Sequence, residues 1–438
     1  MHFPTTRGGP AVPFTTALFA GLAPDGGLYV PEAIERWPDA ELARLPRRTL
    51  TEIALRVLRP FARGEIDPAV LEAVVVEALN FDIPIVEVTP GFFALELFHG
   101  PTLAFKDVGA RVMARLMAAL HHADEPLTVL AATSGDTGSA VAHAFYRVPH
   151  TRVVILYPDG RVSPTQEAQL TMFNGERTNV RAYAVAGSFD DCHRLTREAF
   201  DDAALRSRMR LTSANSVNVG RLLPQMVYYF HAVAQLASVG QAGRPAVFCT
   251  PSGNFGNLTA GLFAKRSGLA VDRFIAATNV NDVVPAYLAS GVFSPRPSVQ
   301  TLANAMDVGH PSNFERMSWL YAGDVDAMRR DITGVAFTDD DVRTTIREVF
   351  ETCGYLLDPH SAIAFSGLVD RVRSPGQAGV FLATAHPAKF AEIVEPIVGR
   401  AVEKPAALVQ ALARPRHIIK IDASYAAVRA QLEDSIRD

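Results

Sequence analysis

The stretch LTVLAATSGDTGSAVAHAFYRVPHTRVVILY, residues 127–157, contains a pattern that repeats through most of this chain. Two apolar runs, LTVLAA and TRVVILY, enclose a segment in which a helix is expected from Gly138. Continuous runs of Val, Ile and Leu separated by amphipathic helices are typical of parallel sheets that are covered on both faces. The stretch therefore predicts a strand, a helix and a second strand of an α/β protein.

The same alternation continues along the chain. Further apolar runs stand at NVRAYAVA, PAVFCT, RFIAAT and GVFLAT, and helices are expected from about Thr165, Asp190 and Leu258. The first part of the chain differs, because ELARLPRRTLTEIALRVLRPFA and DPAVLEAVVVEALNF carry apolar residues at intervals of three and four. Asp67 before Pro68 is a predicted helix N-cap. We predict a mainly helical N-terminal subdomain that ends near residue 90.

Composition narrows the class of protein. The chain has 438 residues with 48% hydrophobic content, which is enough for two or three packed domains. Its net charge of −4, with no long run of like charges, favours a small-molecule partner over nucleic acid. The beginning of the chain has no signal-peptide pattern and no apolar stretch reaches membrane-spanning length, so a cytosolic protein is expected. The spacing of the 3 cysteines and 12 histidines indicates neither a disulfide framework nor a metal site.

The loop PSGNFGN, residues 251–257, follows the run AVFCT and precedes the helical pattern LTAGLFAK. A short glycine-bearing turn between a buried strand and a helix directs backbone N–H groups and the positive end of the helix at one place, which suits a phosphate. An ordinary tight turn is the alternative. Asn254 and Asn257, together with two glycines, favour the anion site.

A second loop, TSGDTGSA at residues 133–140, also lies between a strand and a helix. Its hydroxyl groups, among them those of Ser134 and Thr137, and its two glycines suit a carboxylate or another anion. The spacings of a nucleotide P-loop and of GxGxxG are both missing, which disfavours nucleotide binding. We predict that one loop binds a cofactor phosphate and the other a substrate carboxylate.

Lys106 stands in HGPTLAFKDVG, residues 99–109, between Phe105 and Asp107. An apolar surround lowers the pKa of a lysine by desolvation, and a neutral amine can form a Schiff base. The alternative is a surface lysine paired with Asp107. Together with the two anion loops, the setting favours a lysine that carries a covalent cofactor.

These motifs resemble those of pyridoxal-phosphate enzymes of the tryptophan-synthase β fold type and, more narrowly, those of the longer threonine synthases. The resemblance runs nearly end to end through TTRGG, GLAPDGGLYVP, ELFHGPTLAFKD, ATSGDTGSAVAHAFY, YPDGRVSPTQ, LTSANSVNVGRLLPQ, PSGNFGNLTAGLFAK, AATNVND and ATAHPAKF. It implies fold type II: two three-layer α/β domains with parallel sheets and an N-terminal, mainly helical subdomain. The expected division is 1–90 for this subdomain, 91–108 with 232–438 for the large cofactor-binding domain, and 109–231 for the small domain.

The resemblance also implies an activity, the conversion of O-phospho-L-homoserine and water to L-threonine and phosphate. Lys106 would hold pyridoxal 5′-phosphate as a Schiff base and then act as the base for the α- and β-protons of the substrate. The cofactor phosphate would lie on the backbone of Gly253, Asn254, Phe255, Gly256 and Asn257. Thr384 would lie next to the pyridine nitrogen, although a helix N-cap is the alternative for it. A monomer or homodimer is expected, with no nucleic-acid and no membrane partner.

A dianionic leaving group needs cations or oriented donors close to it. For the substrate phosphate the sequence offers Arg161, Ser163, Asn215, Asn218 and Arg221. Each arginine could instead be a structural or solvated charge. His386 and Lys389 have no assigned role beyond packing or surface.

Asp136 matches the longer threonine synthases but departs from the pattern of the wider fold type, in which many members have an asparagine that donates to the ring oxygen of the cofactor. An ionised aspartate would repel that oxygen, so Asp136 must be protonated, turned away or engaged elsewhere. Two other functions stay open. One is a relative that acts on serine, threonine or acetylserine, which needs no second phosphate site. The other is a non-catalytic binder of anionic amino acids, which has no use for the amine of Lys106.

Overall fold

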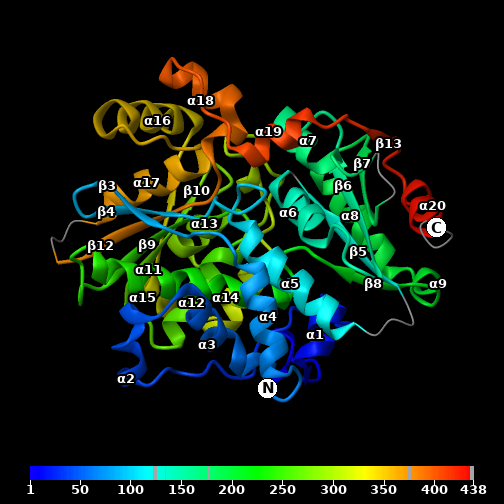
Figure 1. Ribbon diagram of the computed structural model, residues 1–438, viewed down its shortest axis with the longest axis horizontal. Coiled ribbons are helices and arrows are strands. Elements are labelled where there is room, and N and C mark those ends of the chain that lie inside the picture. Colours follow the sequence, from blue (N-terminus) through cyan, green and yellow to red (C-terminus); the bar gives the residue numbers. More distant parts are fainter. Residues whose placement is uncertain (122–125, 134, 175–177, 373–375, 435–438) are drawn as a thin grey trace.

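The computed structural model describes residues 1–121, 126–133, 135–174, 178–372 and 376–434. In these residues the strands form a six-stranded sheet, a five-stranded sheet and a two-stranded sheet near the N-terminus. The six-stranded sheet lies on the left and the five-stranded sheet on the right in Figure 1, with the first helices of the chain below them. The two large sheets confirm the predicted α/β class.

The six-stranded sheet has the order β11-β10-β9-β12-β4-β3. Its neighbouring strands are parallel except for the edge pair of β3 and β4, which is antiparallel and joined by a short turn. The strands are β3 (Ile85–Thr89), β4 (Phe92–Glu96), β9 (Ala246–Pro251), β10 (Val271–Thr278), β11 (Ile332–Ala336) and β12 (Ala378–Ala383).

The five-stranded sheet has the order β13-β7-β6-β5-β8 and is parallel throughout. Its strands are β5 (Leu127–Ala132), β6 (Thr151–Pro158), β7 (Val180–Val185), β8 (Arg210–Ser213) and β13 (Ile419–Ile421). Every residue of β5 is buried. Leu127, Val129 and Ala131 pack into one core, whereas Leu130 and Ala132 pack into another, because successive side chains of a strand point to opposite faces. This two-sided burial explains the continuous apolar run in the sequence.

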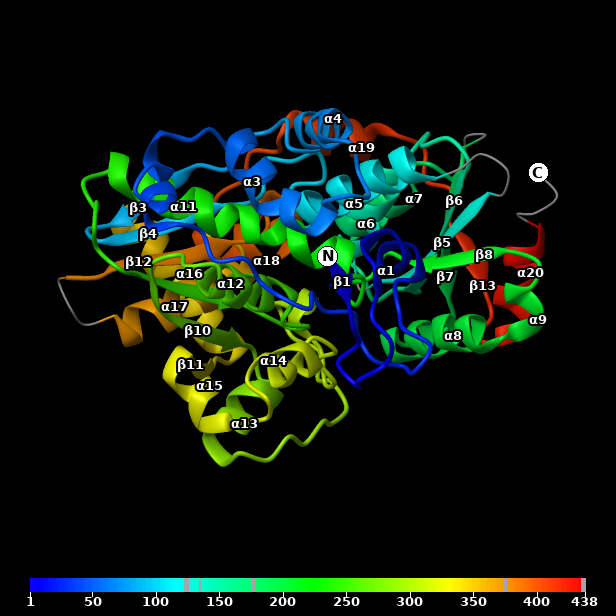
Figure 2. The ribbon, with the colours of Figure 1, turned by 90° about the horizontal axis from the view of Figure 1, so that it is seen from below.

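Helices cover both faces of each large sheet, as Figures 1 and 2 show together. In the six-stranded sheet, α17 packs on β9, β10 and β12, and α12 packs on β10. In the five-stranded sheet, α6 and α8 both pack on β5 and β6. The helices from residue 106 to residue 266 are α5 (Lys106–Leu120), α6 (Asp136–Phe145), α7 (Pro164–Thr171), α8 (Phe189–Asp201), α9 (Ala203–Arg206), α10 (Val219–Leu222), η2 (Leu223–Gln225), α11 (Met226–Ser238) and α12 (Gly256–Arg266).

The later helices surround the six-stranded sheet or extend toward the five-stranded one. In Figure 2, α13, α14 and α15 lie together at one end of the molecule, beside β10 and β11. The 3-10 helix η4 and α18 follow β12 directly. These helices are α13 (Val283–Ser290), η3 (Asn304–Met306), α14 (Phe314–Leu320), α15 (Val325–Asp331), α16 (Asp339–Cys353), α17 (Pro359–Arg371), η4 (Pro387–Phe390), α18 (Ala391–Val398), α19 (Ala406–Ala413) and α20 (Tyr425–Asp434).

The N-terminal part is mainly helical, as predicted, and packs on the rest of the chain through α4 against α5 and α3 against α11. Asp67 caps α4 by accepting from the N–H group of Ala69, with proline at the first helical position. Thr49 and Glu52 form a capping box at the start of α3. The elements are β1 (His2–Phe3), β2 (Val12–Pro13), α1 (Phe14–Ala20), α2 (Asp39–Leu42), η1 (Leu45–Arg47), α3 (Leu50–Ala62) and α4 (Pro68–Ala78).

The structure differs from the sequence expectation in the short N-terminal pair β1 and β2 and, within the two large sheets, in three strands that were not predicted, β8, β11 and β13. All three are edge strands, and RLTS, ITGVA and IKI are too short or too polar to stand out as buried runs. The position of β13 bears on the expected domain division, which placed residues 232–438 in the large domain. This strand pairs with β7 in the five-stranded sheet, so the end of the chain returns to the other sheet. The domain boundaries themselves stay a prediction.

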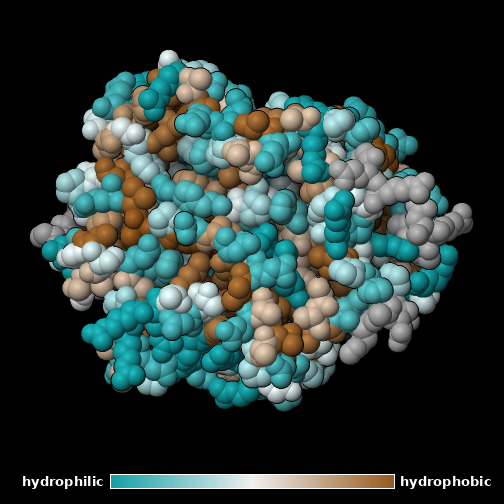
Figure 3. Space-filling view, in the orientation of Figure 1, coloured by the Kyte–Doolittle hydropathy of each residue, from teal (hydrophilic) through white to brown (hydrophobic). Residues whose placement is uncertain are grey.

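The outer surface is polar on the face seen in Figure 3, where apolar side chains form small separate spots. The strongly hydrophilic area at the lower left of that face lies over α2 and α3. Most large apolar side chains of the described residues are buried. Of the helices in the described parts of the chain, none is both long and apolar enough to span a bilayer.

Candidate active site

A cavity of about 240 Å³ lies where strands of both large sheets end. Loops that follow β5, β8, β9 and β12 contribute to its lining through Thr133, Asn215, Gly253 and Thr384. The carboxyl ends of parallel strands are the usual place for ligands in α/β proteins. The two sheets thus build one site between them.

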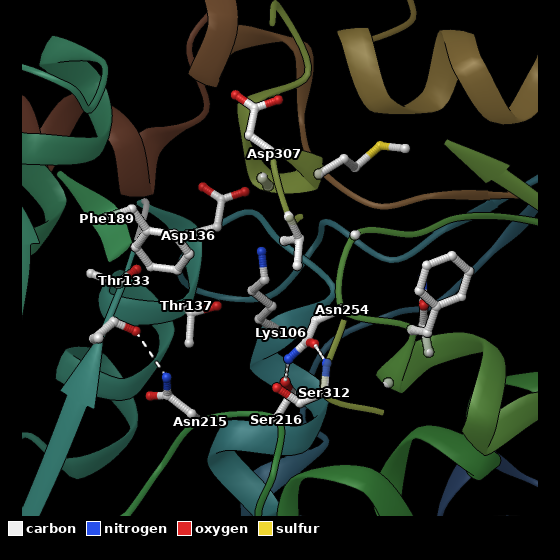
Figure 4. Close-up of a pocket in the computed structure, with 18 of the residues that line it drawn as sticks. Lys106, Thr133, Asp136, Thr137, Phe189, Asn215, Ser216, Asn254, Asp307 and Ser312 are labelled. Atoms are coloured by element: carbon white, nitrogen blue, oxygen red, sulfur yellow. Dashed lines mark hydrogen bonds between the residues drawn. The ribbon is translucent and has the colours of Figure 1, made fainter. Parts of the chain in front are cut away.

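Lys106 is the first residue of α5 and its amino group points into this cavity (Figure 4). The N–H group of the preceding residue, Phe105, donates to the carbonyl oxygen of Thr384 at 2.9 Å, which attaches the start of α5 to the end of β12. The alternative of a surface lysine paired with Asp107 does not hold, because Asp107 is buried and accepts from both the N–H and the hydroxyl group of Thr102 at 2.8 Å. Burial lowers the pKa of Lys106 to about 8, so a usable fraction of the amine is neutral near pH 7.

The loop of residues 253–257 presents unbonded backbone N–H groups to the cavity. Among the described residues, no acceptor is bonded to the N–H groups of Gly253, Asn254, Phe255, Gly256 or Asn257. Phe255, the N-cap of α12, has a left-handed backbone with φ of 59°, which is uncommon for a residue with a side chain. Consecutive free N–H groups at the positive end of an 11-residue helix fit a phosphate, as the sequence predicts.

The side chains of this loop hold it in place. Asn257 donates to the carbonyl oxygen of Pro251 at 2.9 Å and accepts from the hydroxyl group of Ser252 at 2.7 Å. Asn254 donates to the hydroxyl oxygen of Ser216 and accepts from the N–H group of Ser312, as the dashed lines in Figure 4 mark. The two asparagines therefore fix the loop, and the backbone is left to bind the anion.

Replacing Gly253 with alanine is expected to destabilise the protein by about 1–3 kcal/mol, the usual cost of overpacking. An added Cβ would lie 2.7 Å from the Cα of Met306 and 3.0 Å from the carbonyl oxygen of Ala305, and backbone atoms cannot move aside easily. Gly256→Ala is the matched control, because its Cβ would have no atom closer than 3.5 Å. Urea unfolding of the cofactor-free variants measures the difference. Equal midpoints for the two variants would contradict this account of the loop.

Asp136, which lines the cavity, forms a buried ion pair with Lys389. Asp136 is the first residue of α6, and its Oδ1 lies 2.7 Å from Nζ of Lys389, with side-chain exposures of 3% and 0%. Burial alone would raise the pKa of Asp136, but the cations Lys389 and Lys106 hold it below its ordinary value. Asp136 is thus ionised and engaged with Lys389. The assignment of Lys389 to packing or surface was wrong, since no local pattern indicates which carboxylate a lysine will reach.

Arg221 is buried and lines the cavity without a carboxylate partner among the described residues. Its Nη1 donates to the carbonyl oxygen of Ala214 at 2.7 Å, and its Nε is buried with no acceptor in the described part of the chain. Burial lowers the pKa of this guanidinium to about 10. A buried cation without a counter-ion, facing a cavity, indicates that the ligand brings negative charge.

Some of the other predicted site residues line the cavity and some do not. Thr137, Asn215 and Thr384 line the cavity, and Thr384 is not the cap of the following helix, which is capped by His386. Three residues lie outside the lining in this conformation: Arg161 is exposed, Ser163 caps α7, and Asn218 is buried and caps α10. Ser134 lies outside the described residues.

Sequence reasoning missed a whole segment of the cavity wall. Residues 305–310 and Ser312 line one side, and the carboxylate of Asp307 is directed away from Lys106 in Figure 4. Burial raises the pKa of Asp307 to about 7, and its carboxylate accepts from Thr301 and Asn279. The segment follows no strand, so the pattern of strand and loop could not indicate it. Phe189, Asp190, His193 and Arg197 of α8 and His360 of α17 also line the cavity and were not predicted.

Comparison with known proteins agrees with this geometry. A family model described as pyridoxal-phosphate dependent enzyme matches residues 79–384, and models of the threonine synthase N terminus and C-terminal part match residues 2–79 and 361–432. The threonine synthase of Serratia marcescens is 44% identical over 418 residues, which cover 95% of each chain.

Solved structures are similar over the whole length. The crystal structure of threonine synthase from Escherichia coli has a TM-score of 0.92 and 42% identity, and the match covers 99% of this chain and 100% of that one. A threonine synthase structure from Brucella melitensis with bound PLP has a TM-score of 0.92 and 38% identity, and the match covers 100% of both chains. This chain belongs to the threonine synthase family of pyridoxal-phosphate-dependent enzymes.

Proposed function

We propose that this protein is a threonine synthase, which converts O-phospho-L-homoserine and water to L-threonine and phosphate in the last step of threonine biosynthesis. The observation that carries the proposal is the pair of anion sites in one cavity with Lys106. One is the set of free N–H groups at residues 253–257, and the other is the buried guanidinium of Arg221. A cofactor phosphate needs the first site and a phosphorylated substrate needs the second.

The donor set fits pyridoxal 5′-phosphate. Lys106 would hold it covalently, the N–H groups of residues 253–257 would hold its phosphate, and the hydroxyl of Thr384 would lie at the ring. Thr384 is neutral, so it does not impose a proton on the pyridine nitrogen as a carboxylate would. When bound, the cofactor supplies an electron sink for carbanions next to the amino group.

Lys106 is then the base of the reaction. With a pKa near 8, its amine is partly neutral at pH 7 and can take a proton at Nζ and return it. In this role Lys106 removes the α-proton and then the β-proton of the substrate and delivers a proton to the γ-carbon after phosphate has left. A single flexible amine can serve all three positions because they are adjacent in a four-carbon substrate.

The leaving phosphate would bind at Arg221 with Asn215 and the hydroxyl of Ser216, which all line the cavity. Cations and hydrogen-bond donors that are already in place stabilise the charge that develops on a leaving phosphate. The start of α6, with Thr137, would bind the substrate carboxylate at a helix N-terminus. Arg161 and Ser163 have no part in this arrangement.

The purified protein is expected to release one phosphate for each threonine that it forms from O-phospho-L-homoserine. In heavy water the threonine should carry solvent deuterium at the γ-carbon, because that carbon is protonated after phosphate leaves. Mass spectrometry and a phosphate assay measure both results. Threonine without γ-deuterium would exclude the elimination and hydration route. Turnover of serine or threonine instead of the phosphorylated substrate would favour the ammonia-lyase relatives of the fold.

We also propose that the protein acts in the cytoplasm as a monomer or homodimer. Its cysteines support the location, since Cys192, Cys249 and Cys353 are all free thiols. We propose that residues 91–108 with most of residues 232–438 form the large domain and residues 109–231 the small one. The cavity between the sheets supports this division, because it draws its lining from both sides.

A further inference from the structure

The ion pair of Lys389 and Asp136 is an unusual feature to find beside a reactive lysine. Nζ of Lys389 lies 2.7 Å from the carboxylate of Asp136 and donates to the carbonyl oxygen of Thr102 at 2.8 Å, and Lys389 has no exposed surface. Taking two charges out of water costs free energy that their attraction often fails to recover. A buried pair of which one member, Asp136, lines a cavity therefore needs an explanation other than stability.

The position of Asp136 supplies that explanation. Its carboxylate lies at the start of α6 on the wall that the amino group of Lys106 faces, as Figure 4 shows. An uncompensated carboxylate in this position would hold Lys106 as an ammonium ion, which cannot attack a carbonyl group or accept a proton. An ionised aspartate at this position would therefore keep Lys106 unreactive unless another cation balances its charge.

We propose that Lys389 is a positioning residue that neutralises Asp136 and thereby keeps Lys106 available as a free amine. The proposal rests on the proposed attachment of the cofactor to Lys106. The pair of Lys389 and Asp136 then has the same net charge as one neutral side chain at residue 136. Lys389 acts through Asp136 and does not itself contact the reacting atoms.

Other charged or titratable groups line the cavity together with Lys106. Arg221 of α10 lowers the pKa of Lys106, as Lys389 does. Asp307 is held by Thr301 and Asn279, and His360 of α17 is hydrogen-bonded to Asp358 at 2.7 Å. Gln166 donates to the same oxygen of Asp136 at 3.1 Å but brings no charge. Lys389 is thus the cation that directly balances Asp136.

The test measures how fast the full-length protein, freed of cofactor, captures pyridoxal phosphate between pH 6 and pH 10. The midpoint of this profile reports the deprotonation of Lys106, expected near pH 8 in the unaltered protein. Lys389→Met should raise the midpoint by about one pH unit, because Asp136 is left unbalanced, and capture at pH 7 should fall roughly tenfold. Asp136→Asn should lower the midpoint. The double variant should return it close to that of the unaltered protein.

Two further variants separate charge from structure. Lys389→Arg keeps the charge and should leave the midpoint close to that of the unaltered protein. Lys265→Met removes the Lys265–Asp331 pair, which is 2.8 Å long and lies outside the cavity lining, and should not move the midpoint. If Lys389→Met does not fold, the difference between Asp136→Asn and the double variant tests the same charge.

The proposal is overturned if Lys389→Met slows capture equally at every pH, or if the double variant keeps the midpoint of Asp136→Asn. A separate experiment tests the proposed function itself, namely the attachment of the cofactor to Lys106. If Lys106→Ala still captures the cofactor with the same pH profile, then Lys106 is not the attachment point, whatever Lys389 does. Borohydride trapping followed by peptide mapping shows which lysine has reacted in each variant.

Discussion

Alanine in place of Lys106 is expected to abolish covalent attachment of the cofactor and to lower the rate of threonine formation by more than roughly 10³-fold. The amine has two tasks in the proposed reaction, covalent attachment and transfer of several protons, and among the described residues no other lysine lines the cavity. Lys389 is already engaged with Asp136 and Thr102. Loss of the visible absorbance of the bound cofactor and a turnover assay measure the effect.

Lys404→Ala is the matched control, since Lys404 is exposed and does not line the cavity. It should keep both the absorbance and the activity. Borohydride reduction of the unaltered protein should place the pyridoxyl mass on the LAFKD peptide that contains Lys106. A pyridoxyl mass on any other lysine would contradict the proposed mechanism from its first step.

Alanine in place of Arg221 is expected to lower kcat/KM for O-phospho-L-homoserine roughly 30- to 1000-fold. This corresponds to a loss of about 2–4 kcal/mol of transition-state stabilisation. Its guanidinium is buried, faces the cavity and has no carboxylate partner in the described residues, so the leaving phosphate is its natural counter-ion. Cofactor loading should survive, because the N–H groups of residues 253–257 form a separate site. Steady-state kinetics with a cofactor titration separates the two effects.

Arg161→Ala supplies the comparison for this prediction. Arg161 and Arg221 are equivalent candidates in the sequence, but Arg161 is exposed and lies outside the cavity lining. We therefore expect kcat/KM of Arg161→Ala within about twofold of the unaltered protein, which is usual for an exposed charge. A large loss in Arg161→Ala with none in Arg221→Ala would show that the substrate phosphate binds on the other side of the cavity.

Several elements of the fold followed from local pattern. The strands β5, β6, β7, β9, β10 and β12 lie where apolar runs predict them, since a strand buried on both faces needs apolar residues at every position. Asp67 caps α4 because an aspartate before proline suits a helix start whatever lies around it. The loop at residues 253–257 was predicted as an anion site because turn, glycines and helix start are adjacent in the chain.

Tertiary packing decided the rest of the site. Asn218 and Ser163 have the chemistry of ligand-binding residues, yet both cap helices, and nothing in the neighbouring residues distinguishes the two uses. Residues 305–310 line the cavity although they follow no strand of either sheet. The segment has no periodicity that would have indicated it.

Turns, caps and buried strands depend on residues that are close together in the chain, so the sequence of residues 127–157 and 251–257 is sufficient to predict them. The charge state of Lys106 depends on groups that are far from it in the chain: Asp136 at the start of α6, Arg221 in α10 and Lys389 after β12. Electrostatic interactions act through space, and burial makes them strong. Only the folding of two sheets around one cavity brings these charges together, and so only the three-dimensional structure determines whether Lys106 is a reactive amine.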